Sequence, residues 1–173
     1  MRESTVYERF PRWSLLVSNL PSVLVAGIGA FLLEQLYVWL FLPYLVYLIW
    51  AEGRVLRHSC VDCAYYGGGG AFGKGRLCAL LFKKGDPERF AKSTARWTDV
   101  LPDFLAFLVP LGVGIALLVR DFSWVVLGLV LLLGLVSSVG NGVVRGSFAC
   151  RHCRQRAIGC PAARLFGRTA ADS

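Results

Sequence analysis

The stretch SLLVSNLPSVLVAGIGAFLLEQLYVWLFLPYLVYLIW, residues 14–50, holds one acidic side chain, Glu34, and no basic one. A helix crosses the roughly 30 Å hydrocarbon core of a bilayer with about 20 residues, so one helix of this length would overshoot it. A carboxylate at the middle of such a helix would also be costly inside lipid. The stretch therefore predicts a helical hairpin, with a turn at Glu34 and Gln35 and spans at about 15–33 and 36–52.

A second apolar block has the same organisation. Residues 100–119 and 123–144 are apolar runs separated by Arg120 and Asp121, and a kink is expected at Pro110. In the whole chain 55% of residues are hydrophobic and 17% charged, whereas soluble domains carry about 45–50% apolar and about 25% charged residues. We therefore expect an all-α polytopic membrane protein with four spans, forming one membrane domain over residues 1–173.

The basic residues predict the orientation. Of the 19 Lys and Arg, three precede the first span, nine lie between the second and third, six follow the fourth, and Arg120 alone lies in a turn on the other side. The positive-inside rule then places the N-terminus, the loop 53–99 and the tail 145–173 in the cytosol, and the protein in the cell (inner or plasma) membrane. We interpret the formal net charge of +8 as this topology signal, and expect no nucleic-acid partner. The mixed charge before residue 14 makes a cleaved signal peptide the weaker interpretation.

All six cysteines fall on the predicted cytosolic side, and four of them form two C-x-x-C motifs. The first motif follows the second span, and the second follows the fourth span, 90 residues further on. Cytosolic thiols are kept reduced, so close pairs indicate metal ligation or thiol chemistry rather than structural disulfides. Two such pairs supply the four thiolates of a tetrahedral zinc site. The predicted ligands are Cys60, Cys63, Cys150 and Cys153, with Cys160 as a further candidate.

The constant offset suggests a duplicated unit of hairpin and cysteine turn, with Gly70 at the place of Cys160. A duplicated hairpin would bring the two pairs together about a pseudo-twofold axis. An iron–sulfur cluster is the alternative cofactor, because it uses the same ligands. His58 and His152 could replace a cysteine, although a solvent-facing histidine is the simpler interpretation, and Cys78 is expected to be a buried apolar thiol.

The strings HSCVDCAYYGGGGAFGKG (residues 58–75) and ACRHCRQRAIGCPA (residues 149–162) carry a resemblance. With them, the chain resembles a group of small four-span membrane proteins of archaea and some bacteria. The resemblance implies four spans and two cysteine segments, and no established activity. Members of the group carry a cysteine where this chain has Gly70, and Cys78 is an addition here.

Three functions remain open at this level. The first is an integral membrane protein with a cytosolic cysteine metal site, structural or metal-handling; the sequence leaves enzyme activity open and gives it little support. The second is a membrane thiol–disulfide oxidoreductase or electron-transfer protein, disfavoured because each pair follows a helix C-terminus, whose dipole disfavours a thiolate. The third is a transporter of a small solute or metal, suggested by Asn141 between two glycines and by Asn19 in the first span.

The loop between the second and third spans holds two further features. Gly68–Lys74 matches the first seven positions of a phosphate-binding loop, but Gly75 stands where Ser or Thr should bind magnesium. A flexible turn near the membrane surface is therefore favoured. Asp86 and Pro87 predict the start of an interfacial helix at about 87–97. The expected partners are membrane lipids, and a membrane or cytosolic protein at the basic face.

Overall fold

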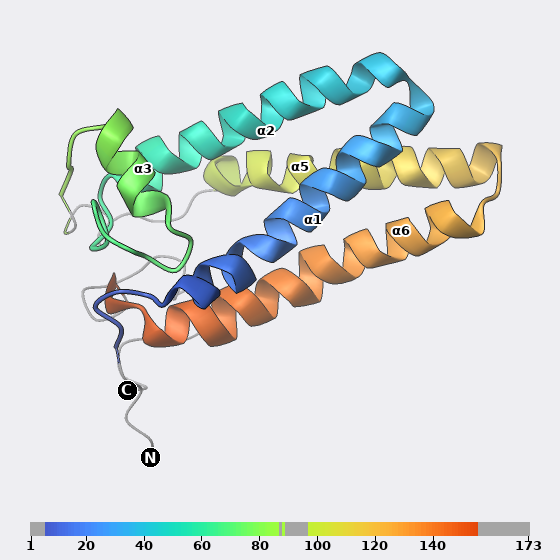
Figure 1. Cartoon of the computed structure of the whole chain (residues 1–173). Coiled ribbons are helices and arrows are strands. Elements are labelled where there is room, and N and C mark those ends of the chain that lie inside the picture. Colours follow the sequence, from blue (N-terminus) through green and yellow to red (C-terminus); the bar gives the residue numbers. More distant parts are fainter. Residues whose placement is uncertain (1–5, 87, 89–96, 156–173) are drawn as a thin grey trace. The chain divides into compact units, whose positions relative to one another are not determined.

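The computed structural model describes residues 6–86, 88 and 97–155, and the regular elements of this part of the chain are all helical (Figure 1). Four helical spans are long and apolar enough to cross a membrane. They are Arg12–Leu36, Val38–Cys60, Leu101–Arg120 and Trp124–Val144. The predicted all-α fold with four long apolar helices is confirmed.

The first hairpin begins with helix α1, Arg12–Leu36. The helix ends because Tyr37 adopts an extended conformation (φ −156°, ψ 121°), while its N–H still closes on the carbonyl of Leu33 at 2.9 Å. Glu34 and Gln35 therefore lie in the last turn of α1, and the chain reverses at Tyr37 rather than at the polar pair. A helix that continues past the polar pair keeps more of its backbone groups hydrogen-bonded than one that stops there, which is favourable inside lipid.

The second half of this hairpin is also helical. A single 3₁₀ turn, η1 (Val38–Leu40), leads into α2 (Phe41–Val55), which passes without a break into the π-helical segment η2 (Leu56–Cys60). The first C-x-x-C motif begins at the last residue of η2. After a glycine-rich loop the chain forms α3 (Lys74–Leu81), which the sequence did not lead us to expect.

The second hairpin consists of α5 (Trp97–Arg120) and α6 (Trp124–Leu135), joined by a turn of three residues. The N–H of Asp121 binds the carbonyl of Leu117 at 2.8 Å, which closes the last turn of α5. Beyond α6 the chain stays helical to the second C-x-x-C motif. These further elements are η3 (Val136–Gly140) and η4 (Gly142–Ala149), both π-helical, and the 3₁₀ turn η5 (Cys150–His152).

The chain divides into two compact units. Unit 1 comprises residues 1–19, 53–96 and 143–173, and unit 2 comprises residues 20–52 and 97–142. Unit 1 thus collects the segments that flank the apolar spans, including both C-x-x-C motifs.

The predicted interfacial helix at 87–97 lies mostly outside the described residues. Of its expected start, the described residues show one contact: the Asp86 carboxylate accepts a hydrogen bond from the N–H of Glu88 at 2.9 Å.

Unit 2 has an apolar core formed where α1, α5 and α6 meet. Ile28, Leu32 and Leu133 are its buried centre, and α5 and α6 residues including Phe107 and Leu129 pack around them. A Cβ added at Gly114 would collide with Val130 and Leu32, so this glycine allows α5 to come close to the neighbouring helices. Small residues at such contacts are typical of helices that associate within a membrane.

A buried tyrosine repairs a gap in the hydrogen bonding of α5. Pro110 lacks an N–H, so the carbonyl of Ala106, four residues earlier, loses its helical partner. The hydroxyl of Tyr44 on α2 donates to this carbonyl at 2.9 Å, and Tyr44 is only 4% exposed. Gly29 of α1 leaves the space for the phenol, because a Cβ there would collide with the Tyr44 hydroxyl. The proline is thus accommodated by a polar contact between helices rather than by water.

We expect Tyr44→Phe to destabilise unit 2 by about 1 kcal/mol, because it leaves the Ala106 carbonyl unpaired in an apolar setting. Thermal unfolding in detergent, followed by circular dichroism, measures the change. Tyr37→Phe is the matched control, since Tyr37 is 70% exposed and its variant should unfold like the wild type. Equal unfolding temperatures for all three proteins would show that the Tyr44 hydrogen bond contributes nothing.

Candidate metal centre

The two C-x-x-C motifs adopt the same turn within unit 1. The N–H of Cys63 binds the carbonyl of Cys60 at 3.3 Å, and the N–H of Cys153 binds that of Cys150 at 3.4 Å. The first motif begins at the last residue of the π-helical η2, and the second begins at Cys150, directly after the π-helical η4. All four thiols are half-buried. A turn closed between the first and fourth residues lets both sulfurs of a pair point in one direction, which is the geometry that a metal knuckle uses.

Two reciprocal hydrogen bonds hold these turns together. The N–H of Ala64, directly after Cys63, donates to the side-chain oxygen of Gln155 at 2.8 Å. The N–H of Arg154, directly after Cys153, donates to the hydroxyl of Tyr65 at 3.0 Å. In both bonds the residue after the last cysteine donates to the side chain two residues after the other motif's last cysteine. The two donor residues are 90 residues apart, as are the two acceptor residues and the two motifs. We call this contact between the two cysteine turns the junction, and its matching bonds give it twofold character.

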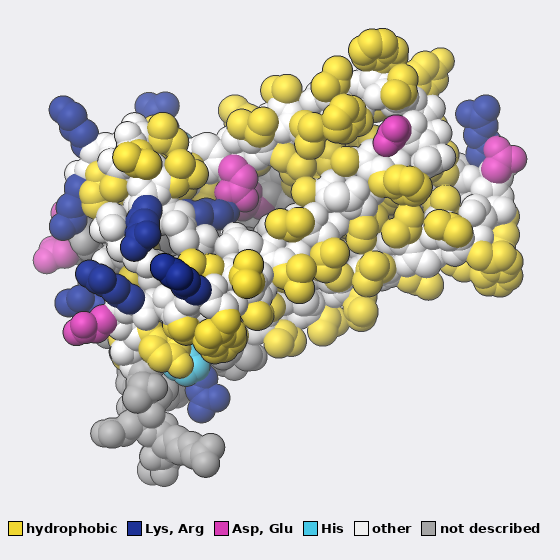
Figure 2. Space-filling model, viewed as in Figure 1, with side chains coloured by type: hydrophobic (Ala, Val, Ile, Leu, Met, Phe, Trp, Pro, Cys, Tyr) yellow, Lys and Arg dark blue, Asp and Glu magenta, His cyan; other side chains and the backbone are white. Residues whose placement is uncertain are grey.

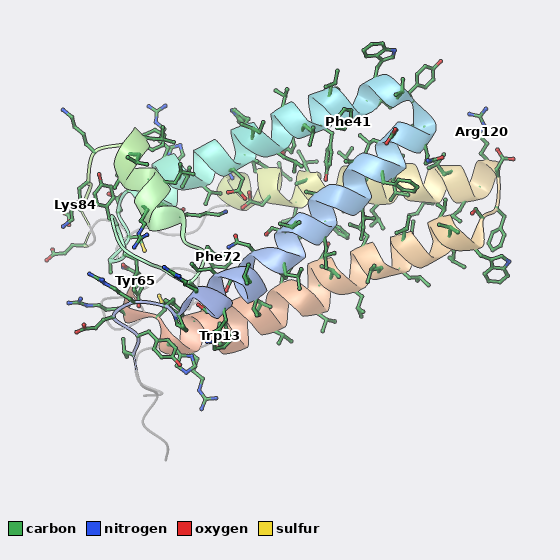
Figure 3. All side chains as sticks on the ribbon, in the orientation of Figure 1. Trp13, Phe41, Tyr65, Phe72, Lys84 and Arg120 are labelled. Atoms are coloured by element: carbon green, nitrogen blue, oxygen red, sulfur yellow. The ribbon has the colours of Figure 1, made fainter. Side chains whose placement is uncertain are left out.

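Tyr65 lies at the centre of this junction, in the loop before α3 (Figure 3). Burial raises the pKa of its phenol above the ordinary value, and the N–H of Arg154 partly opposes this effect. The thiols of Cys153 and Cys63 add to the rise, so both lie close enough to interact electrostatically with the phenol. Through its hydroxyl, Tyr65 thus links the first cysteine turn to the residue that follows the second.

The N-terminal segment before α1 covers the same junction. Tyr7 donates its N–H to the carbonyl of His152 at 3.1 Å, and its carbonyl accepts the Tyr65 hydroxyl at 2.6 Å. The Tyr7 ring stacks on His152 at a centroid distance of 4.8 Å. Phe10 packs edge-on against Tyr65 at 5.7 Å and is only 6% exposed. A segment far away in sequence thus shields the contact between the two cysteine turns from solvent.

Other side chains near the motifs contact groups outside the cysteine turns or face solvent. Asp62, between the first two cysteines, is 8% exposed and accepts the N–H of Asp86 at 2.9 Å. His152 interacts through Nδ1 with the carbonyl of Phe148 at 3.1 Å, and His58 is exposed. Cys78 is fully buried, with Sγ 3.6 Å from the carbonyl of Leu56, and burial raises the pKa of its thiol. Cys78 is the buried apolar thiol that we predicted.

No group of three or more His, Cys, Asp or Glu side chains is gathered closely enough to hold a metal ion within residues 6–86, 88 and 97–155. Cys160, the fifth candidate ligand, and the rest of the tail from residue 156 lie outside the described part of the chain. That the four cysteine sulfurs gather around one metal ion therefore stays a prediction. The structure adds the adjacency of the two turns that such a site requires.

The glycine-rich loop does not form a phosphate-binding loop. The N–H groups of Gly67, Gly68 and Gly73 donate to backbone carbonyls of the same loop region. A Cβ at Gly75 would collide with the carbonyl oxygens of Tyr65 and Gly68. The Ser or Thr that would bind magnesium at this position therefore does not fit, and nucleotide binding has no support here.

The side chains of the two asparagines that suggested transport both donate hydrogen bonds to backbone carbonyls. Asn19 donates to the carbonyls of Leu15 at 2.7 Å and of Phe72 at 3.2 Å, so it ties α1 to the glycine-rich loop in unit 1. Asn141 donates to the carbonyl of Ser137, one turn earlier, at 3.3 Å. These contacts give each asparagine a structural role.

Sequence reasoning missed Tyr65, Gln155 and Tyr7, the three side chains or backbone groups that join the cysteine turns. Tyr65 and Gln155 had one usable signal, because each stands two residues after the last cysteine of its motif. Tyr7 had none, since a tyrosine before a predicted span is typical of the membrane interface.

Tyr65→Phe should lower the free energy of unfolding by about 1–3 kcal/mol, because it leaves the Tyr7 carbonyl and the Arg154 N–H without this partner. The raised pKa of Tyr65 adds a pH dependence with a definite sign. Its stabilising effect is complete below the ordinary phenol pKa of 10.0 and is lost as pH rises through the raised pKa of the folded state. As pH rises above the ordinary phenol pKa of 10.0, the unfolding temperature should fall more steeply for the wild type than for Tyr65→Phe.

Tyr66→Phe is the matched control for this test. Tyr66 donates to the carbonyl of Phe82 at 2.6 Å and takes no part in the junction. Its variant should keep the wild-type pH dependence while losing some stability. Parallel pH profiles for the wild type and Tyr65→Phe would contradict the assignment.

These observations define the class of the protein: over the described residues it is all-helical, with four helices that could cross a membrane and two cysteine turns within unit 1. Comparison with protein-family models, with curated proteins and with solved structures finds no match.

Proposed function

We propose that this protein is a four-span membrane protein whose cytosolic face carries one metal ion or cluster bound between its two C-x-x-C turns. The ligands would be Cys60, Cys63, Cys150 and Cys153, with Cys160 as a further candidate. The single observation that carries the proposal is the reciprocal pair of hydrogen bonds between the turns, Ala64 to Gln155 and Arg154 to Tyr65. These bonds place two segments separated by 90 residues next to each other, as a metal site shared between them requires.

The proposed role of the metal is to tie the loop after the second span to the tail after the fourth. Four thiolates around Zn²⁺ leave a formal charge of about −2. The positive charge of Arg154 acts on Tyr65 beside Cys63 and Cys153, so it is placed to offset part of this charge. Zinc is the first candidate, and an iron–sulfur cluster, which takes the same four ligands, is the second. A metal-handling role would use the same site.

The orientation is part of the same proposal. The positive-inside rule supports a cytosolic N-terminus, loop and tail, because 18 of the 19 Lys and Arg flank the spans on that side. The cysteines would then sit in a reducing compartment, where they remain available to bind metal. The resemblance to small four-span membrane proteins of archaea and bacteria is likewise a proposal, which agrees with this architecture.

Metal analysis of the purified full-length protein, with its visible spectrum, tests the proposal. We expect about one zinc per chain and no visible absorbance, or a brown, oxygen-sensitive protein if the site holds iron and sulfide. A metal-free protein whose thiols cycle between dithiol and disulfide would instead identify a thiol–disulfide oxidoreductase. Reporter fusions after Ser173 test the orientation separately, and an extracellular reporter would overturn the cytosolic placement.

A further inference from the structure

Helix α3 exposes an apolar face outside the four candidate spans. Leu77, Leu80 and Leu81 are 49%, 82% and 61% exposed, and their spacing places them on one side of the helix. Cys78, beside this face on the same helix, is fully buried, and its Sγ reaches the carbonyl of Leu56. The helix is thus held to the rest of unit 1 through Cys78, while its three leucines remain exposed.

Basic side chains surround this leucine face. Residues 64–84 contain Lys74, Arg76, Lys83 and Lys84 and no acidic residue. Arg76, Lys83 and Lys84 are exposed, and Figure 2 shows Lys and Arg side chains next to hydrophobic ones around α3. A short leucine face rimmed by cations is the pattern of a helix that lies in the headgroup region of an anionic lipid leaflet.

The position of α3 supports the same partner. Within unit 1, α3 packs against η2, which is the last part of the candidate span Val38–Cys60. The end of a membrane-crossing helix lies at the boundary between hydrocarbon and water. A helix held against that end is therefore held at the depth where leucine side chains can enter the acyl region while lysines reach phosphates.

We propose that α3 is a lipid-binding helix that inserts Leu77, Leu80 and Leu81 into the cytosolic leaflet and binds anionic headgroups through Arg76, Lys83 and Lys84. This inference rests on the proposed membrane location of the spans and is independent of metal binding. It assigns the glycine-rich loop a purpose: the loop turns the chain back so that α3 lies along the surface.

Photocrosslinking of the full-length protein in nanodiscs tests the inference. Leu80→benzoylphenylalanine is irradiated in bilayers that mix anionic phosphatidylglycerol with neutral phosphatidylcholine, and adducts are identified by mass spectrometry. We expect lipid adducts enriched in phosphatidylglycerol relative to its share of the bilayer. Adding Lys83→Gln and Lys84→Gln should return the anionic share of the adducts towards that of the bilayer, because the attraction to the headgroups is weakened.

Two further probe positions make the result decisive. Leu16→benzoylphenylalanine, in the first candidate span and 75% exposed, should give lipid adducts and reports that the spans are in the bilayer. Glu8→benzoylphenylalanine, at an exposed polar position of unit 1, should give few lipid adducts. Lipid adducts at Leu16 without any at Leu80 would overturn this inference alone, as would crosslinks from Leu80 to a second copy or another protein. No lipid adducts at Leu16 would overturn the membrane proposal itself.

Discussion

Cys63→Ser and Cys153→Ser are each expected to remove bound metal from the purified protein, from about one equivalent per chain to less than about a tenth. A serine hydroxyl does not replace a thiolate as a soft, anionic ligand, and one missing ligand opens a tetrahedral structural site to water. Each change removes a ligand from only one turn. The loss should nevertheless be complete in both variants, because the proposed ion is shared between the turns. Elemental analysis of the detergent-purified variants measures it.

Cys78→Ala is the matched control, since Cys78 is a buried thiol whose Sγ contacts the carbonyl of Leu56 rather than the junction. It should retain wild-type metal content. Metal that survives in Cys153→Ser but not in Cys63→Ser would show that the first turn binds the ion without the second. Metal that is lost only from Cys78→Ala would place the site elsewhere.

Gly75→Ala is expected to destabilise unit 1 by more than about 3 kcal/mol, or to prevent its folding. The added Cβ would collide with the carbonyl oxygens of Tyr65 and Gly68. Both are backbone atoms, so neither can swing aside as the end of a long side chain can. The carbonyl of Gly75 also accepts the N–H of Gly67 at 3.0 Å, so the loop cannot open locally without losing that bond. Thermal unfolding and the yield of monodisperse protein report the effect.

Gly53→Ala controls for the general effect of adding a methyl group. Nothing lies within 4 Å of a Cβ at Gly53, which is in α2. Alanine is the better helix former, so this variant should be as stable as the wild type or slightly more stable. Normal folding of Gly75→Ala would mean that the loop does not close against Tyr65 as the structure has it.

The four apolar helices could be predicted because length and hydropathy are local properties of the sequence. Residues 14–50 alone require two helices, whatever the rest of the chain does. The position of the first reversal was less accessible. Glu34 is the obvious polar break, yet α1 runs two residues past it and turns at Tyr37, because the helix completes its hydrogen bonds before it ends.

The candidate site was only partly predictable. The repeated C-x-x-C motif and its 90-residue offset indicated which segments should meet. The groups that join them, Tyr65 and Gln155, belong to residue types that occur everywhere in proteins, and only their matching positions distinguish them. Helix α3 was missed because Gly73 and Gly75 suggest a loop, whereas the structure uses Gly73 at φ +69° to start the helix.

X-ray absorption at the edge of the bound metal in the wild-type protein tests the shared cysteine site most directly. If both turns bind one zinc ion, the first shell should fit about four sulfurs at about 2.3 Å and no nitrogen or oxygen. An iron–sulfur cluster in the same place would give a sulfur shell with an additional iron–iron distance. A zinc shell with two sulfurs or fewer, completed by nitrogen or oxygen, or a protein that binds no metal, would contradict the account.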